Sequence, residues 1–173
     1  MTLLRHLLSI LLLPFVMVVV VPRWILTSWT PTDSRWPAGS TLAAGGRVLG
    51  GLLFITGLAL FTWCVVLFAR VGRGTLAPWD PTQRLVAVGP YRHVRNPMIS
   101  GVATMLAGEA LFHGSRLLAA WLGVFALINH LYFLIAEEPG LARRFGASYQ
   151  EYKAAVPRWV PRLRPWRGTQ PAP

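Results

Sequence analysis

Residues 89–101 place charged and amide side chains directly ahead of an apolar segment, in the order Gly-Pro-Tyr-Arg-His-Val-Arg-Asn-Pro-Met-Ile-Ser-Gly. Pro97 is typical of the first turn of a helix, where its missing N–H costs nothing. Arg95 and Asn96 therefore come at a helix N-terminus, where free N–H groups and the positive end of the helix dipole attract anions. Because a guanidinium group binds carboxylates through a fork of donors, this segment is a candidate anion site. Anchoring to lipid phosphates is the simpler alternative for such cations.

An acidic pair, Glu137 and Glu138, ends the last long apolar run and is followed by Pro139. Two adjacent carboxylates at the edge of such a run cost free energy unless they meet cations. The structural interpretation is a salt bridge to Arg92 or Arg95. The functional interpretation is that one carboxylate binds a cationic group of a ligand. We expect the basic segment to fold against the acidic pair.

Polar residues also interrupt the apolar runs themselves. His130 lies two turns before the acidic pair and shares a helix face with Glu137, next to Asn129. Such groups, Glu109 among them, are either parts of a binding site or hydrogen-bonding partners between helices, and the sequence leaves both open. The four histidines and the single cysteine show no metal-ligand spacing, so no metal site is predicted.

The composition predicts an integral membrane protein. Of the 173 residues 54% are hydrophobic and only 13% are charged, which is too apolar for a soluble domain of this size. The apolar residues form four blocks of spanning character, at about 3–26, 46–69, 97–112 and 116–136. Beyond residue 138 the apolar residues recur every three or four positions, which predicts an amphipathic helix on the membrane surface. We therefore expect an all-α single domain in which residues 1–69 form a two-span packing region and residues 70–173 carry the candidate site.

The net charge of +11 is distributed around the spans rather than over one face of a soluble domain. This pattern indicates membrane topology and argues against a nucleic-acid partner. With four spans, one side of the membrane receives thirteen Lys and Arg residues and the other side four. The positive-inside rule then places both termini in the cytoplasm, and we expect the protein in the inner membrane of a bacterium. Nothing in the sequence predicts the oligomeric state.

Four motifs follow one another within residues 70–162: Gly-Pro-Tyr-Arg-His-Val-Arg-Asn-Pro-Met, Glu-Glu-Pro-x-Leu, Phe-Gly-x-x-Tyr-x-x-Tyr and Val-Pro-Arg. The ordered series resembles the isoprenylcysteine carboxyl methyltransferase family, in a bacterial-type form. The related phospholipid N-methyltransferases share much of this signature. The resemblance implies a small polytopic methyltransferase that uses S-adenosylmethionine at the cytosolic membrane face, without a Rossmann domain. It also implies a lipophilic substrate that enters from the surrounding membrane lipids. For the cofactor, it implies a gap the size of a nucleoside between the basic segment and the acidic pair.

The resemblance assigns roles to most of the following residues, and the chemistry of the side chains adds His93, His130 and the catalytic candidates. Residues of the basic segment are expected to line the cofactor pocket: Gly89, Pro90, Tyr91, His93, Asn96 and Pro97. Downstream, the expected cofactor contacts are His130, Glu137, Glu138, Tyr149 and Tyr152. The expected catalytic residues are Arg95, Glu138 and Arg158.

Methyl transfer from a sulfonium is an in-line displacement that needs positioning and electrostatics more than covalent help. A carboxylate acceptor, as in an isoprenylcysteine, would need a cation such as Arg95 or Arg158 and no base. An amine acceptor, as in a phospholipid, would need a base such as His93, His130 or a glutamate. Carboxyl methylation is the leading expectation and phospholipid amine methylation the first alternative. The remaining alternatives are an NADPH-dependent membrane reductase of the sterol-reductase type and a lipid-binding protein without catalysis.

Overall fold

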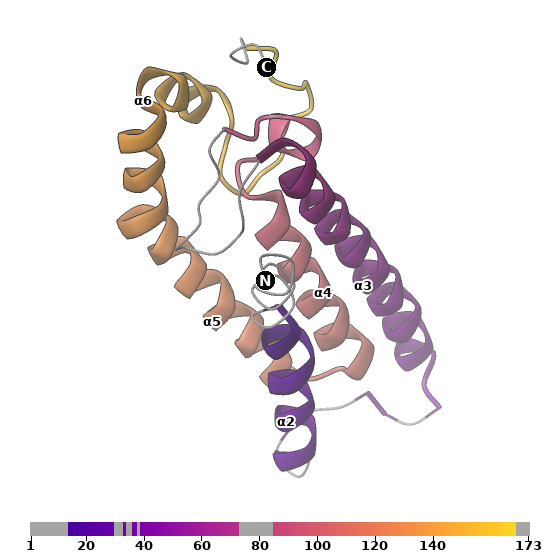
Figure 1. Cartoon of the computed structure of the whole chain (residues 1–173). Helices are drawn as coiled ribbons and strands as arrows, with labels where there is room; N and C mark the ends of the chain where they lie inside the picture. Colours follow the sequence, from indigo (N-terminus) through magenta and orange to yellow (C-terminus); the bar gives the residue numbers. More distant parts are fainter. Residues whose placement is uncertain (1–13, 30–32, 34–35, 38, 73–84, 169–173) are drawn as a thin grey trace.

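The structure is a computed structural model, and it describes residues 14–29, 33, 36–37, 39–72 and 85–168. Over these residues it is helical, with no strand (Figure 1). A first helix is formed by η1 (Val16–Val20) and α2 (Val21–Ser28), and α3 (Thr41–Leu67) continues into η2 (Phe68–Gly72). The short η3 (Gly89–Arg92) precedes α4 (Pro97–His113). The chain then forms α5 (Arg116–Tyr132), η4 (Phe133–Glu137) and α6 (Glu138–Ala155).

The helix ends follow local chemistry. The α3 helix begins after Ser40, whose side chain accepts a hydrogen bond from the Ala43 N–H, and Ser115 caps α5 through the Leu118 N–H in the same way. Pro97 opens α4 as predicted, and Gly114 ends it with a left-handed φ of 65°. Because only Gly114 and Ser115 separate α4 from α5, the two helices fold back into a hairpin.

Glycines bring α3 and α4 into backbone contact along their length (Figure 1). A Cβ on Gly50 would lie 2.6 Å from the Gly108 carbonyl oxygen, and one on Gly57 would lie 2.6 Å from that of Gly101. Both pairs are seven residues apart on their helix, so they recur on one face every two turns. This close approach is the small-residue packing that helices use in lipid, where the hydrophobic effect cannot drive association.

The last expected span and the surface helix are one continuous helical segment. Glu137 and Glu138 keep helical backbone angles, so α5 runs through η4 directly into α6. The bend comes later, at Gly146, with φ 53° and ψ −129°. The acidic pair therefore ends the apolar run, as expected, while the helix itself continues through it. α6 ends at Ala155, before Val156.

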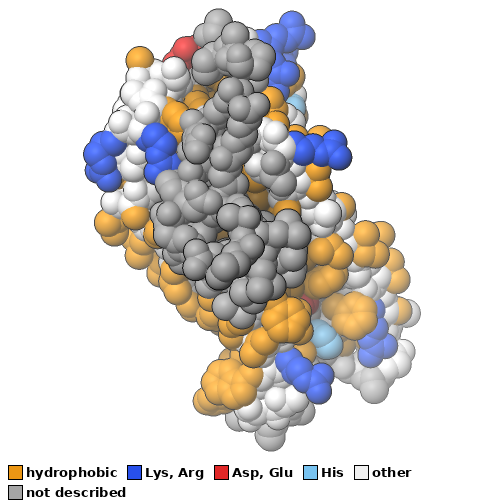
Figure 2. Space-filling view, viewed as in Figure 1, with side chains coloured by type: hydrophobic (Ala, Val, Ile, Leu, Met, Phe, Trp, Pro, Cys, Tyr) orange, Lys and Arg blue, Asp and Glu red, His pale blue; other side chains and the backbone are white. Residues whose placement is uncertain are grey.

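Two helical segments are long and apolar enough to cross a membrane, α3 and the helix that begins at Arg116. Large apolar side chains on their outer faces are exposed, for example Leu52, Ile55, Leu127 and Ile128. On the face shown in Figure 2, hydrophobic side chains lie between two groups of Lys and Arg near the ends of the molecule. Such surfaces indicate a membrane protein. The described parts of the other two expected spans, η1–α2 and α4, are shorter, and residues 3–13 lie outside the described residues.

Candidate active site at the end of the α5 helix

Glu138 is bound by three cations from three parts of the chain. Its Oε1 accepts a hydrogen bond of 2.8 Å from Nη1 of Arg95 and another of 2.8 Å from Nε of Arg158. Its Oε2 lies 2.9 Å from Nζ of Lys153. The side chains of Glu138, Arg95 and Arg158 are only 6%, 11% and 15% exposed, whereas that of Lys153 is 42% exposed. Arg95, Arg158, Lys153 and Glu138 are called the Glu138 cluster below.

The position of the Glu138 cluster follows from helix geometry. The 20 residues from Arg116 to Ile135 suffice to cross roughly 30 Å of hydrocarbon, so Glu137 and Glu138 come at the membrane surface. Arg95 lies just before Asn96, the residue at the N-cap of α4, which begins at the same end of the hairpin. Arg158 follows the last residues of α6 and returns to the start of that helix. The predicted proximity of the basic segment and the acidic pair is therefore confirmed, with Arg95 rather than Arg92 as the partner.

The two neighbouring glutamates differ in their electrostatics. Burial opposes ionisation of Glu138, but the hydrogen bonds from Lys153 and Arg158 and the charge of Arg95 together lower its pKa below the usual value. For Glu137, burial and the adjacent charge of Glu138 outweigh the effect of Arg95 and raise the pKa from 4.5 to about 7. The site thus holds one carboxylate that is ionised at neutral pH and one that titrates there.

A second layer of contacts joins His130 to the Glu138 cluster. Nδ1 of His130 accepts a hydrogen bond of 3.1 Å from the indole N–H of Trp159, and the Arg158 Nη1 lies 3.4 Å from the same atom. Because tryptophan and arginine are donors only, the neutral imidazole must carry its proton on Nε2. The rings of His130 and Trp159 also stack, with centroids 6.4 Å apart. His130 therefore orients Arg158 and Trp159 through its unprotonated nitrogen.

The C-terminal tail, residues 156–166, pairs with the basic segment. Backbone N–H groups connect them in both directions: Arg95 donates to the Pro157 carbonyl (2.9 Å), and Arg162 donates to the His93 carbonyl (3.0 Å). The His93 Nδ1 lies 2.8 Å from the Arg162 carbonyl oxygen, and Arg92 Nε donates to the Trp166 carbonyl at 2.7 Å. The side chains of Arg92 and His93 thus hold the tail, which in turn carries Arg158 to Glu138.

Aromatic residues pack against this tail. Tyr152 donates a hydrogen bond of 2.7 Å to the Tyr91 carbonyl oxygen, and its ring meets that of Trp166 at 5.3 Å. Tyr149 is 2% exposed and packs beside Tyr152. Gly89, with φ +55°, turns the chain into η3, where an added Cβ would come within 2.9 Å of Leu67. In this structure the two tyrosines of α6 are packing residues whose burial raises their pKa values.

The structure thus joins Arg95, His130, Glu138 and Arg158 in one network and places Tyr91, Tyr149 and Tyr152 in the adjoining core. Pro90 and Pro97 are buried, and the Asn96 carbonyl accepts from the Ser100 N–H. Sequence reasoning missed Lys153 and Trp159. A lysine three residues before Val156 and a tryptophan directly after the Val-Pro-Arg motif were the available signals, but neither residue type is distinctive at a membrane surface. The cofactor roles and the nucleoside-sized gap stay predictions.

Comparison with known proteins identifies the family to which this arrangement belongs. The profile of the phospholipid methyltransferase family matches residues 46–148, from near the start of α3 into α6. The chain therefore belongs to the phospholipid methyltransferase family, and the resemblance drawn from the motifs is confirmed.

One curated relative is methanethiol S-methyltransferase 2 of Bradyrhizobium diazoefficiens, which is 40% identical over 76 residues. The aligned part covers 42% of this chain and 27% of the relative, so the chain matches about a quarter of that protein's length. No solved structure matches the chain.

Proposed function

We propose that this protein is a membrane-embedded methyltransferase that uses S-adenosylmethionine to methylate a lipophilic acceptor at the cytosolic membrane face. The observation that carries the proposal is the Glu138 cluster, in which the largely buried Arg95 and Arg158 meet the Glu138 carboxylate beside Glu137, in a chain from a methyltransferase family. Charged groups concentrated at the edge of the hydrocarbon layer are costly, and a polar ligand that they bind offsets that cost.

The residues present fit the charges of S-adenosylmethionine. Its amino-acid end carries a carboxylate, for which Arg95 and Arg158 are suitable partners, and its ammonium and sulfonium groups suit Glu137. The Nε of Arg95 is buried and has no hydrogen-bond partner within the part of the chain that the structure describes. A buried donor of this kind costs free energy until an acceptor reaches it. When bound, the cofactor supplies an electrophilic methyl group, which forms a bond to the acceptor's lone pair while the electrons of its bond to sulfur return to sulfur.

For an isoprenylcysteine-like acceptor, the chain's own task is to hold a carboxylate in line with the methyl group. Carboxylates are nucleophiles without loss of a proton, so no base is required. Arg158 is the better candidate to orient the acceptor, because its guanidinium contacts His130 of α5, which Trp159 holds in place by a hydrogen bond. The apolar outer face of α5, with Leu127, Ile128 and Leu131, borders the route by which an isoprenoid chain would arrive from the lipid.

A thiol is the second candidate acceptor, because the relative from Bradyrhizobium diazoefficiens is named as a methyltransferase of methanethiol. A thiol reacts as its thiolate, so the chain must accept a proton. His130 is unsuited to this task in the observed arrangement, since its Nδ1 already accepts from donors and its Nε2 carries the proton. Glu137, whose pKa is raised to about 7, is the better base for a thiol or for a phospholipid amine.

The proposal is tested in two steps on the full chain in detergent. Calorimetric titration with S-adenosylhomocysteine and with NADPH should give heat with the first alone. Heat from NADPH alone would support a reductase, and no heat from either would support a lipid-binding protein. Transfer of radiolabelled methyl groups is then measured to an S-farnesylcysteine derivative, to an alkanethiol and to phosphatidylethanolamine. Label in the farnesylcysteine ester is expected, and label in only one of the other two would assign that acceptor instead.

A further inference from the structure

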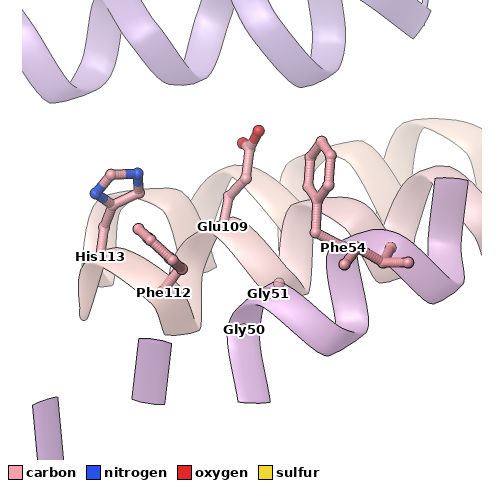
Figure 3. A pocket seen from close by; sticks show the side chains of 8 residues that line it. Gly50, Gly51, Phe54, Glu109, Phe112 and His113 are labelled. Carbon is pink, nitrogen blue, oxygen red and sulfur yellow. The ribbon is translucent and has the colours of Figure 1, made fainter. Parts of the chain in front are cut away.

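A second polar group inside the helices lies far from the Glu138 cluster. A cavity of about 260 Å³, open to the surface on one side, lies between α3 and α4, and its walls include Gly50, Gly51, Phe54, Phe112 and Glu109. Figure 3 shows the Glu109 carboxyl standing between the rings of His113 and Phe54, on the same side of the helix pair. Glu109 is twelve residues beyond Pro97, which is about 18 Å along α4 from the end that holds the cluster. The cavity is therefore separate from the candidate active site.

The lining is apolar except for two side chains. Phe54, Ile55 and Phe112 supply hydrocarbon, the glycines supply bare backbone, and Glu109 and His113 supply polar atoms. The Oε2 of Glu109 is buried and has no hydrogen-bond partner among the described residues. A carboxyl oxygen left unpaired in apolar surroundings costs free energy, and polar groups inside spanning helices are functional candidates for that reason.

We propose that this cavity binds an alkylammonium group, that is, an amine carried on a short apolar body and drawn from the bilayer. An ammonium group donates hydrogen bonds and would supply the positive counter-charge for the Glu109 carboxylate. The hydrocarbon part of the ligand would pack against the aromatic walls. At about 30 Å³ for each water-sized unit, the cavity holds roughly nine such units. That is enough for a short alkyl chain or a single ring and too small for the whole of S-adenosylmethionine. The volume of the cavity therefore distinguishes its proposed ligand from the cofactor of the proposed methyl transfer.

The structure offers matched variants for a test. An added Cβ on Gly51 meets nothing within 4 Å, so Gly51→Leu fills the cavity without moving the backbone. Gly45 on the same helix is equally unobstructed but does not line the cavity, and Gly45→Leu is its control. Glu109→Gln removes the carboxylate at nearly constant volume. Its control is Glu151→Gln, at an exposed position on α6.

The experiment titrates hexylammonium and hexanol into the full chain in phosphatidylcholine nanodiscs and follows binding by calorimetry. Hexylammonium should bind, and both Glu109→Gln and Gly51→Leu should weaken it at least tenfold, whereas the two control variants should bind as the wild type does. Circular dichroism and gel filtration verify that each variant is folded, and two independent test variants keep the outcome decisive if one of them fails to fold.

Two results would overturn the proposal. Equal binding of hexanol and hexylammonium, unchanged by Glu109→Gln, would mean an apolar cavity with no preference for an ammonium group. Equal binding of hexylammonium by all five proteins would mean partition into the lipid alone. Because neither readout depends on S-adenosylmethionine, failure here is distinguishable from failure of the proposed methyltransferase function.

Discussion

Glu137 and Glu138 are adjacent in sequence but differ in protonation, and the difference is the main chemical feature of the candidate site. Glu138 touches three cations, so its proton is lost readily, whereas burial raises the pKa of Glu137 to about 7. Near neutral pH the site can therefore change its net charge by one through Glu137. This property bears directly on how it would hold a cationic ligand group.

We predict that cofactor affinity depends on pH through Glu137. If this carboxylate binds the ammonium of S-adenosylhomocysteine, it must be ionised, so affinity should rise as the pH increases from 6 to 8, across the pKa of about 7. Glu137→Gln should abolish that rise and weaken binding roughly tenfold at pH 8, where a charged partner is worth on the order of 1–2 kcal/mol. Calorimetry at three pH values measures both effects. An unchanged pH profile in the variant would assign the proton to another group.

We predict that Glu138→Gln destabilises the fold. It leaves the buried guanidinium groups of Arg95 and Arg158 without their counter-charge, a loss of about 3 kcal/mol or roughly 6–12 °C in the unfolding midpoint. The folded-state pKa of Glu138 lies below its usual value, so its stabilisation is fully present above about pH 4.5 and is lost as the pH falls through the folded value. The difference in midpoint between wild type and variant should therefore shrink in acid. Glu151→Gln serves as the exposed control, and a midpoint equal to wild type at pH 7 would contradict the prediction.

At the scale of elements, the α3–α4 contact depends on which glycine faces the partner helix. A Cβ on Gly50 would lie 2.5 Å from the Phe112 backbone nitrogen, and backbone atoms cannot yield cheaply. We predict that Gly50→Ala lowers stability by on the order of 2 kcal/mol, or roughly 4–8 °C. Gly51→Ala meets open space and should be neutral or slightly stabilising, since alanine favours helix. Thermal unfolding of both variants in one detergent measures the contrast, and equal midpoints would mean that the helices are not packed this closely.

The elements also show what the sequence can and cannot predict. Pro97 predicted the start of α4, because a proline acts through its own backbone chemistry and needs no tertiary context. The meeting of Arg95 with Glu138 followed from opposite charges at the same end of a hairpin. The continuation of α5 into α6 was not predicted. Pro139 lies in the first turn of α6, and a proline there is compatible with a new helix after a break and with a continuous helix that lacks one N–H donor.

Lys153 and the tail were the other unpredicted parts. Lys153 reaches Glu138 because α6 bends at Gly146, and a bend placed by a single glycine has no periodic signal. The pairing of residues 92–95 with residues 157–166 uses backbone groups, which every residue carries, so composition does not reveal it. The sequence thus predicted which charged side chains would meet, whereas the backbone pairing between distant segments became evident only in the structure.

At the scale of the whole molecule, the charge distribution makes a prediction about orientation. Thirteen Lys and Arg residues fall on the side of the Glu138 cluster in a four-span topology, and four fall on the other side, so the cluster, the tail and both termini should face the cytoplasm. Cys64 is fully buried, and it is the only cysteine, so a Cys64→Ala background allows single cysteines to report topology. Arg116, at the start of α5, and Arg164, in the tail, are both exposed and mark opposite ends of the α5 helix.

A maleimide that cannot cross membranes should label Arg116→Cys in intact bacterial spheroplasts and should label Arg164→Cys only after the membrane is opened. The reason is that the hydrocarbon layer excludes the reagent from one end of the roughly 30 Å crossed by α5. The reverse pattern would place the Glu138 cluster outside, away from the side that the positive-inside rule assigns to it. Labelling of both positions from the same side would mean that α5 does not cross the membrane, and the proposed entry of a lipophilic acceptor along its outer face would then fail with it.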